Sequence, residues 1–429
     1  MKSRKIIKLT MASLFAALPL CAQVYTTGDV YAPQSTSIPY YLSETVTVGI
    51  TSTGVLHIDS GGTAYMATLS VGSSATAVGT VSVDGGRLEV EAYGKIGDMG
   101  SGALVINSGT ASFIELNAGV NAGSTGSLQI SNGVLTTSGA TNLGVSGSAA
   151  LAISGGAVTF SNITLGANIG SSGVITMSNG SLKGQTTSIG VNGTGALYIT
   201  GGNATFASLK LGAGYSGSGT IRLTGGTLTS VGGSNTMGAG GAGFFVVDGG
   251  TATMTSVFVG GESAGTLDLK SGSFYGIGGF MVGNHASGAT GTLTVSSNMD
   301  NVNLENVFFG QAADVTLRVD GNDATYGGAF VHVNELFMNA QGSYVIDLSD
   351  YTGSLGVPLA ILTAQQVDQP ATEISWIIKG YAADKSEGKV LYSFWEDGTL
   401  YVGMTIPEQA ASAGLLGLLA LAFVARRRK

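Results

Sequence analysis

The sequence contains very little cysteine, proline and charge. Of its 429 residues, 1 is cysteine, 6 are proline and 10% are charged. A single cysteine excludes an intrachain disulfide and any metal site built from several thiolates. Low charge beside 44% hydrophobic residues also excludes an intrinsically disordered chain, which stays unfolded because it is charged and poor in apolar residues. The chain therefore folds without a disulfide of its own.

Glycine, by contrast, is abundant. The 70 glycines make up about one residue in six, roughly twice the average usage. They lack the strict every-third spacing of collagen, so a triple helix is excluded. Few helix-forming charged residues and many Gly, Ser, Thr and Val favour an all-β protein. No proline stands between residues 40 and 357, as expected where every backbone N–H joins a sheet.

The N-terminus has the pattern of a secretory signal peptide. Lysines and an arginine within the first eight residues precede an apolar stretch over residues 9–20. The small residue Ala22 predicts cleavage after it, and so a signal peptide over residues 1–22. Lipoprotein processing at Cys21 is the alternative, but it requires a small residue before the cysteine, where Leu20 stands. Cleavage after Ala22 leaves a mature chain without a thiol.

The C-terminus has three parts: a short motif, an apolar run and a basic end. Pro407, Glu408 and Gln409 precede the apolar residues 410–425. The basic end consists of Arg426, Arg427, Arg428 and Lys429. As a helix, the apolar run measures about 24 Å, somewhat less than the hydrocarbon core of about 30 Å. Its plain interpretation is a membrane anchor whose basic end stays in the cytoplasm.

This order of motif, apolar segment and arginine block resembles the PEP-CTERM sorting signal of Gram-negative bacteria. The family motif is Pro-Glu-Pro, and Gln409 stands where the last proline would be. The resemblance implies a sorting tail with a hydrophobic helix over residues 406–429 and an exosortase-type processing enzyme as partner. It further implies export across the inner membrane to the cell surface, outer envelope or extracellular space. The tail would hold the chain in the membrane transiently or permanently.

Removing both ends makes the chain strongly acidic. The signal contains 4 of the 18 basic residues and the last four positions contain 4 more, which leaves 10. If Glu408 leaves with the tail, 25 of the 26 acidic residues remain. The net charge is then 10 − 25 = −15, against −8 for the whole sequence. Such a surface repels phosphates, so nucleic acid is excluded as a partner.

One motif recurs between these ends. Its first anchor is an apolar residue, a polar residue and a pair of Gly, Ser or Asn, and the copies end at Gly61, Gly86, Gly109, Gly133, Gly156, Gly180, Gly202, Gly226, Gly250, Gly272, Asn298 and Asn322. These twelve copies are spaced by 261/11, or about 24 residues. A second anchor, an apolar residue followed by glycine, keeps the same period at Gly72, Gly97, Gly144, Gly166, Gly190, Gly212, Gly238, Gly260, Gly283 and Gly310.

The repeat predicts a parallel β-solenoid. In one copy, Leu197 and Ile199 alternate with outward positions, Gly201 and Gly202 turn the chain, and two more short strands follow. Three short strands cannot enclose a core alone, so the copies must stack, each strand pairing with its equivalent in the next coil. We expect an all-β solenoid (β-helix) of about twelve coils. Propeller blades need nearly twice this period, and sandwich strands would not keep the glycine register.

The repeats resemble the glycine-rich β-helix repeats of autotransporter passenger domains. We expect an N-terminal lead-in or cap over residues 23–50, the solenoid over 51–328 and a β-rich C-terminal cap over 329–405. A cap is needed because an open solenoid end is an unpaired sheet edge. Trp376 and Trp395 both lie in the last segment, and Asp397 followed by Gly398 predicts a hairpin there.

A column of mostly hydroxyl residues is the candidate ligand face. Three positions after successive anchor glycines stand Ser112, Thr136, Thr159, Lys183, Thr205, Thr229 and Thr253. They should stack outward along one side of the solenoid, where a flat hydroxyl array can meet a glycan or ice. An ice-binding face would need more regular Thr-x-Thr rows. The alternative is that threonine is simply a favourable exposed strand residue.

A catalytic site has few residues available to it. No Asp or Glu stands from residue 116 to 247, so the middle coils cannot supply the carboxylate pair of a hydrolase or lyase. Acids remain toward the ends, at Glu89 and Glu91 and again at Asp314, Asp320 and Asp323, where they can equally be solvated surface charge.

The sequence therefore predicts a non-enzymatic exported β-solenoid with a structural or adhesive role. We expect no catalytic residues, cofactor or metal site, since His57, His285 and His332 are far apart. The expected partners are glycans or other surface proteins, and the membrane through the tail. The alternative is a β-helix that binds or degrades polysaccharide, using Asp320 and Asp323.

Overall fold

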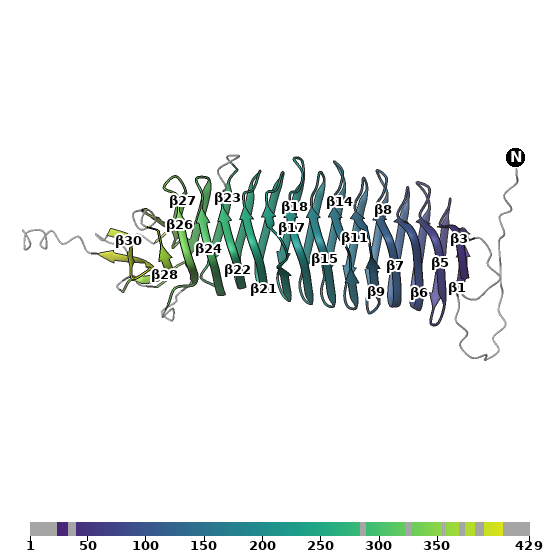
Figure 1. Cartoon of the computed structure of the whole chain (residues 1–429), viewed down its shortest axis with the longest axis horizontal. Helices are drawn as coiled ribbons and strands as arrows, with labels where there is room; N and C mark the ends of the chain where they lie inside the picture. The colour runs from purple at the N-terminus through teal and green to yellow at the C-terminus, as the bar shows by residue number, and fades with distance from the viewer. Residues whose placement is uncertain are drawn as a thin grey trace, which may run out of the picture.

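The chain folds into a single parallel β-solenoid. The structure is a computed structural model and describes residues 24–32, 40–283, 289–321, 328–353, 355, 357–368, 374–381 and 390–405. These residues form 31 strands and no helix, wound into about 11 turns with a period of about 24 residues. The predicted all-β solenoid is confirmed. Figure 1 shows the strands stacked along a rod, with β1 toward one end and β30 at the other.

The strands have the following bounds. The N-terminal end contains β1 (Val24–Gly28), β2 (Val30–Tyr31) and β3 (Tyr40–Val48). The first half of the rod contains β4 (Thr53–Asp59), β5 (Thr63–Val71), β6 (Val78–Ile96), β7 (Ser101–Ala118), β8 (Thr125–Ile130), β9 (Val134–Thr137), β10 (Ala140–Leu143), β11 (Ser148–Ile153), β12 (Ala157–Thr159), β13 (Asn162–Leu165), β14 (Ser172–Met177) and β15 (Ser181–Ile189). The second half contains β16 (Thr194–Ile199), β17 (Asn203–Leu211), β18 (Ser218–Leu223), β19 (Thr227–Ser230), β20 (Asn235–Met237), β21 (Ala242–Val259), β22 (Gly265–Val282), β23 (Gly291–Ser296), β24 (Met299–Phe309), β25 (Ala313–Arg318), β26 (Val331–Met338) and β27 (Ser343–Asp347). The C-terminal end contains β28 (Leu359–Val367), β29 (Ile377–Lys379), β30 (Val390–Glu396) and β31 (Thr399–Thr405).

Each coil has three faces. In the coil of β16 and β17, residues 194–199 form face A, residues 203–206 form face B, and residues 208–211 form face C. Every segment pairs in parallel with its equivalent in the next coil, as β16 does with β18 and β17 with β19 and β20. Side chains on a strand alternate between the two sides of a sheet, so each face has outward and inward columns.

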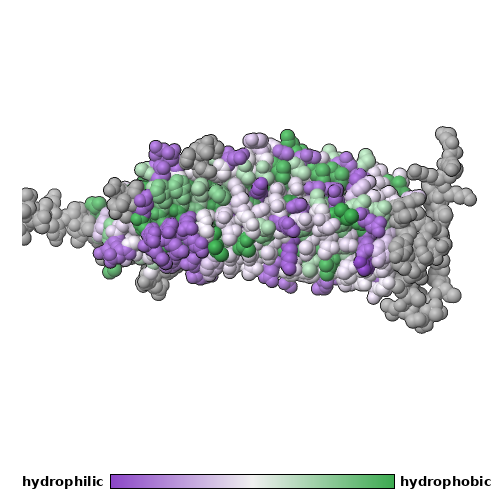
Figure 2. Space-filling model, in the orientation of Figure 1, coloured by the Kyte–Doolittle hydropathy of each residue, from purple (hydrophilic) through white to green (hydrophobic). Residues whose placement is uncertain are grey.

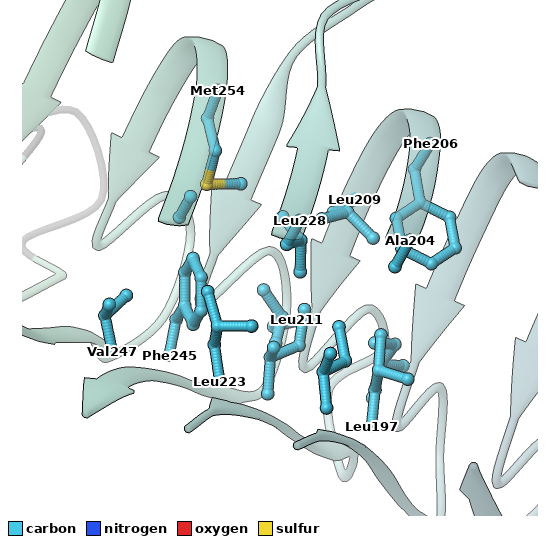
Figure 3. Packing of buried hydrophobic residues seen from close by; sticks show 14 of the residues in the cluster. Leu197, Ala204, Phe206, Leu209, Leu211, Leu223, Leu228, Phe245, Val247 and Met254 are labelled. Atoms are coloured by element: carbon cyan, nitrogen blue, oxygen red, sulfur yellow. The ribbon is translucent and has the colours of Figure 1, made fainter. Parts of the chain in front are cut away.

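The inward columns form one continuous hydrophobic core, whereas much of the visible surface is hydrophilic or of intermediate hydropathy (Figure 2). Leu197, Leu209 and Leu211 point inward from one coil and are at most 1% exposed. Figure 3 shows them packing against the inward residues of neighbouring coils, among them Leu223 and Phe245. The core thus runs along the rod, and each coil buries its apolar side chains only with the coils beside it.

Glycine makes the corner between faces C and A possible. Gly190 follows β15 with a φ of 69°, in the left-handed region that other residues avoid. A Cβ there would also collide with the carbonyl oxygen of Ser218, at the start of β18. Glycines with positive φ recur at this corner in neighbouring coils, which explains the second anchor of the sequence repeat.

The corner loops between faces C and A alternate in length over the middle coils. Loops of six residues, 119–124, 166–171 and 212–217, alternate with loops of four residues, 144–147, 190–193 and 238–241. The long loops close on a backbone hydrogen bond, for instance from Ser171 N to Asn168 O at 3.0 Å. Their tips include Ile169 and Tyr215, which are 80% and 90% exposed. The structural unit of this region is therefore a pair of coils.

Antiparallel strands cover both ends of the ladder. At the N-terminal end β1 pairs antiparallel with β4 and β2 with β3. After residue 328 the parallel ladder continues through β26 and β27, and antiparallel pairing begins where β31 joins β28 and β30. Because β31 lies between β28 and β30, these three strands form a small antiparallel sheet at the C-terminal end.

Candidate ligand-binding faces

The threonine column predicted from the sequence lies on face B as an aligned ladder. We call Ser112, Thr136, Thr159, Lys183, Thr205, Thr229 and Thr253 the threonine ladder. Its members are direct partners in the parallel register, from Ser112 with Thr136 through to Thr229 with Thr253. The preceding residue in the middle coils, such as Leu182 or Leu228, is fully buried, so the ladder side chains point outward.

The ladder presents hydroxyl groups at the repeat distance of the coils. Adjacent strands in a sheet lie about 4.8 Å apart, so consecutive rungs repeat at that spacing. A second column beside it contains Asn203 and Thr227, whose side chains are joined by a hydrogen bond of 2.8 Å from Thr227 Oγ1 to Asn203 Oδ1. Lys183 supplies the ladder's positive charge. The face can therefore donate to and accept from a regular array of hydroxyls or neutral polar groups.

A shallow groove lies at the N-terminal end of the ladder. Its volume is about 530 Å³, and Glu89, Ser112 and Thr136 line it together with Ile114. Glu89 continues the register of the ladder by one rung beyond Ser112, and Ile114 is 47% exposed. The groove thus combines a carboxylate, hydroxyls and an apolar side chain, which is a suitable lining for one or two sugar rings.

The described acids proposed for the catalytic alternative make contacts within the fold. Glu89 forms an ion pair with Arg87, and Arg87 also lies over the ring of Tyr65. Asp320 accepts a hydrogen bond from Ser296 Oγ, and its N–H donates to Ser297 Oγ at 2.9 Å. The carboxylates of Glu89 and Asp320 thus bind neighbouring side chains of the fold, one toward each end of the rod.

The other predicted acids and the histidines are not brought together. Asp314 lies on face A in register with Thr292 of β23, and Asp323 lies outside the described residues. His57 stacks on Tyr25 with ring centroids 4.5 Å apart, and His332 Nδ1 lies 2.8 Å from Thr363 Oγ1. His285 lies outside the described part of the chain. Across the described ranges, no three His, Cys, Asp or Glu residues are grouped where they could hold a metal ion.

Carboxylates near the N-terminal end are held ionised by hydrogen bonds. Ser82 Oγ and Asn107 Nδ2 each donate to Asp84 at 2.6 Å, and the Ser82 bond is the main cause of the lowered pKa of Asp84. The backbone N–H of Thr51 likewise lowers the pKa of Asp29. A carboxylate with a lowered pKa is a poor general acid, so neither group is suited to protonating a leaving group.

An apolar column on face C was missed by the sequence analysis. Phe258, Met281, Phe308 and Phe337 are consecutive partners in register and point outward. Phe308 and Phe337 stack with centroids 4.9 Å apart, and Phe337 is 41% exposed. The signal was present: three consecutive apolar residues precede Gly260, Gly283 and Gly310, where earlier repeats place a polar residue in the middle. Figure 2 shows a continuous hydrophobic area toward the C-terminal end of the rod.

The predicted processing signals fall outside the described residues. These are Ala22 at the expected cleavage point and the sorting residues Pro407, Glu408, Gln409, Arg426, Arg427 and Arg428. Within the described ranges, no helix has the length and apolar character needed to cross a membrane. Comparisons with protein-family models, with curated proteins and with solved structures found no match to this chain.

Proposed function

We propose that this chain is a non-enzymatic, exported β-solenoid of the cell surface or extracellular matrix, with a structural or adhesive role. The observation that carries the proposal is the threonine ladder, because seven aligned polar rungs form a regular surface for repetitive contacts. The mechanism is geometric: a stiff rod displays the same groups at a fixed spacing, so many weak contacts add up along a repetitive partner.

The proposed route to the surface rests on sequence patterns. The basic and apolar N-terminus, the Pro-Glu-Gln motif and the apolar and arginine segments support export, followed by sorting through an exosortase-type enzyme. The proposal also includes kinship with the autotransporter-like β-helix repeats, which a solenoid with glycine corners supports. The tail would anchor the rod in the membrane until it is processed.

Glycan is the ligand class that the ladder favours. Its side chains are hydroxyls with one amine, and the middle coils from residue 116 to 247 contain no carboxylate that would repel an acidic polysaccharide. The groove beside Glu89 and Ser112 adds an apolar contact. This combination favours polysaccharide binding as the second candidate function, and it is compatible with adhesion.

Affinity electrophoresis of residues 23–406 through gels containing different polysaccharides tests the proposal. We expect retardation in at least one gel without cleavage of the polysaccharide. Replacing Thr205, Thr229 and Thr253 by Glu should abolish it, since three carboxylates would disrupt the hydroxyl array. Migration of this variant unchanged from the wild type would contradict a role for the ladder.

A matched control lies on face C of the same region. Thr164, Ser188 and Thr236 are outward hydroxyl residues of that face, and Lys210 lies in their column. Replacing these three by Glu adds the same charge, so retardation should persist. Cleavage of a polysaccharide that is lost in Asp320→Asn would instead establish the degrading alternative. Free migration in every gel would leave a structural rod.

Processing of the tail is tested separately in a host that has an exosortase. Replacing Glu408 by Ala, or Arg426, Arg427 and Arg428 by Ser, should leave the full-length chain in the membrane fraction. Conversion of these variants to the mature size at the wild-type rate would show that the tail is not a sorting signal. The unaltered chain provides the reference rate in the same pulse-chase experiment.

A further inference from the structure

The hairpin of β30 and β31 is apolar on both sides. Leu391, Trp395 and Met404 pack toward the core from one side, and Leu400 and Val402 on that side are fully buried. When one side of an antiparallel sheet packs on the core and the opposite side faces solvent, the solvent-facing side is usually polar. Here it contains Val390, Tyr392, Phe394 and Tyr401, which we call the aromatic face.

The aromatic face is a flat, partly exposed surface. The rings of Tyr392 and Phe394 stack with centroids 5.4 Å apart, and those of Phe394 and Tyr401 with centroids 5.2 Å apart. Val390 at its edge is 54% exposed. Gly403 lies opposite Tyr392, where a Cβ would press on the tyrosine ring. An exposed apolar surface of this kind indicates contact with a partner or a membrane.

Polarity changes along the hairpin. At one end, the base, Val390 pairs with Thr405, where β31 ends. At the other end, the tip, Glu396 and Asp397 are both exposed. The hairpin is therefore apolar where the chain leaves it and acidic at its turn.

The base of the hairpin lies close in sequence to the apolar segment of the tail. Only residues 406–409 separate Thr405 from the apolar segment 410–425. The five steps of chain from Thr405 to residue 410 span at most about 18 Å. If the segment lies in a bilayer, as the proposed function holds, Thr405 is held within that distance of the start of the segment, its strand partner Val390 lies beside it, and Tyr392 lies two residues farther along the strand. A span somewhat shorter than the hydrocarbon core draws the rod closer still.

We propose that the aromatic face docks on the interfacial zone of the lipid bilayer while the tail is inserted, with the base of the hairpin in contact with lipid and its acidic tip in water. Tyrosine suits this zone because its ring is apolar and its hydroxyl remains hydrated. This docking rests on the proposed membrane-anchored function. It would hold the end of the rod at the surface next to the Pro-Glu-Gln motif.

Site-specific fluorescence on the full chain tests the docking. Cys21 is replaced by Ser, so that one introduced cysteine carries the dye NBD, at Val390→Cys on the base or at Thr399→Cys near the tip. Both positions lie on the same side of the hairpin. The protein is reconstituted into phosphatidylcholine vesicles with or without doxyl-labelled lipid. We expect doxyl lipid to cause loss of NBD emission at position 390 and little loss at position 399.

The outcomes separate the docking from the anchor. Chain that remains with the vesicles but loses no emission at position 390 would overturn the docking alone. Equal loss at both positions would overturn the proposed orientation. A dye at position 390 that is shielded from aqueous iodide, yet unaffected by doxyl lipid, would mean that the tail or a second copy covers the face, and this also overturns the docking. Failure of the chain to remain with the vesicles would overturn both proposals.

A ring substitution supplies a second measurement. Tyr392→Ser removes one outward aromatic ring and leaves the inward residues Leu391 and Ser393 in place. In the Val390→Cys background it should reduce the loss of emission caused by doxyl lipid, while flotation with the vesicles is unchanged. Unchanged quenching in this variant would contradict a role for the aromatic ring.

Discussion

Single glycines determine whether a coil can close on its neighbour. A side chain at Gly190 would face two obstacles: the backbone has a φ of 69°, which L-residues avoid, and a Cβ would collide with the Ser218 backbone. At Gly170 φ is 80° with no atom near a Cβ, and at Gly279 neither restriction applies. Alanine substitutions at these three glycines therefore separate the cost of the steric collision from the cost of the strained backbone conformation.

We expect Gly170→Ala to lower the free energy of unfolding by about 1 kcal/mol, since a left-handed conformation costs an L-residue about that much. Gly190→Ala should cost more, about 2–4 kcal/mol, because the collision with Ser218 adds to the strain. Gly279→Ala should be nearly neutral. Urea denaturation followed by circular dichroism measures all three. Equal midpoints for Gly190→Ala and Gly279→Ala would contradict the role of the corner.

The hydrogen bonds of Asp29, between β1 and β2 at the N-terminal end of the rod, predict that the stability of the fold depends on pH. Its Oδ2 accepts hydrogen bonds from Thr51 N at 2.7 Å and Ser52 N at 2.9 Å. The Thr51 bond is the largest cause of its lowered pKa, and slight burial opposes it. A lowered pKa in the folded state means that ionised Asp29 stabilises the fold above the ordinary pKa. This stabilisation is lost as the pH falls through the folded-state pKa.

The wild type should therefore be more stable than Asp29→Asn at pH 7. The difference should begin to shrink as the pH falls below about 4, the ordinary pKa of an aspartate, and vanish at still lower pH. Urea midpoints measured at several pH values follow this difference. A constant difference down to pH 2 would show that the Asp29 carboxylate does not contribute through its charge.

At the level of the element, the polar residue Asn235 replaces a core position. It is fully buried in an inward column of face C, where other coils place apolar residues such as Ile163 and Val257 or the small polar residues Thr141 and Thr187. Its Oδ1 accepts from Leu209 N at 3.1 Å, and its Nδ2 donates to Thr255 O at 2.6 Å. One side chain thus replaces ladder hydrogen bonds on both sides of β20, whose path is altered by the preceding loop.

Asn235→Ala should lower the free energy of unfolding by about 2–4 kcal/mol, because it leaves a buried N–H and a buried carbonyl without partners. Asn142→Ala is the matched control, since Asn142 lies on the outer side of face C and its side chain donates to Asn117 Oδ1 at 2.8 Å. The control should change stability by less than about 0.5 kcal/mol. Similar losses in both variants would contradict the bridging role.

Individual elements were predictable to different degrees. The threonine ladder could be placed because its residues keep a fixed distance from an anchor glycine, and the parallel register preserves that distance. The face C column from Phe258 to Phe337 is predictable by the same rule, because its first three members each stand two positions before an anchor glycine. Asn235 could not be recognised, because its bonds to the backbone of Leu209 and Thr255 leave no pattern in a sequence.

At the scale of the whole molecule, the two-coil unit predicts that the rod can be shortened in register. Deleting residues 145–190 joins Gly144 to Val191 and preserves the alternation of long and short corners. The coil of β8 to β10 then takes the place of the deleted coil of β14 and β15 beside β16, and the two coils have their inward positions in the same register. Because each coil packs only on its neighbours, this one new contact is all that the deletion changes. We expect a folded protein shorter by about 10 Å.

Small-angle scattering measures the maximum dimension, and circular dichroism measures the strand content per residue. Deleting residues 145–178 instead joins a face C corner to a turn that follows face A, so that variant should lose the fold. If both deletions behaved alike, the register between coils would not be what holds the rod together.

The overall architecture was the most predictable level. The period of about 24 residues and the glycine anchors specify a stacked parallel ladder, since short strands can bury apolar residues only by pairing with their equivalents. The ends were less predictable. Antiparallel pairing of β1 with β4 and of β31 with β28 depends on contacts made once, which leave no periodic signal in the sequence.

The alternating corners have a consequence for how the rod measures distance. Its faces repeat once per coil, about every 4.8 Å, whereas the edge that presents Ile169 and Tyr215 repeats once every two coils, about every 9.6 Å. One molecule thus presents two repeat distances, a short one on its faces and one twice as long along its edge. A lattice whose period matches the longer distance would be engaged by the edge, and a polymer with the shorter period would be engaged by a face.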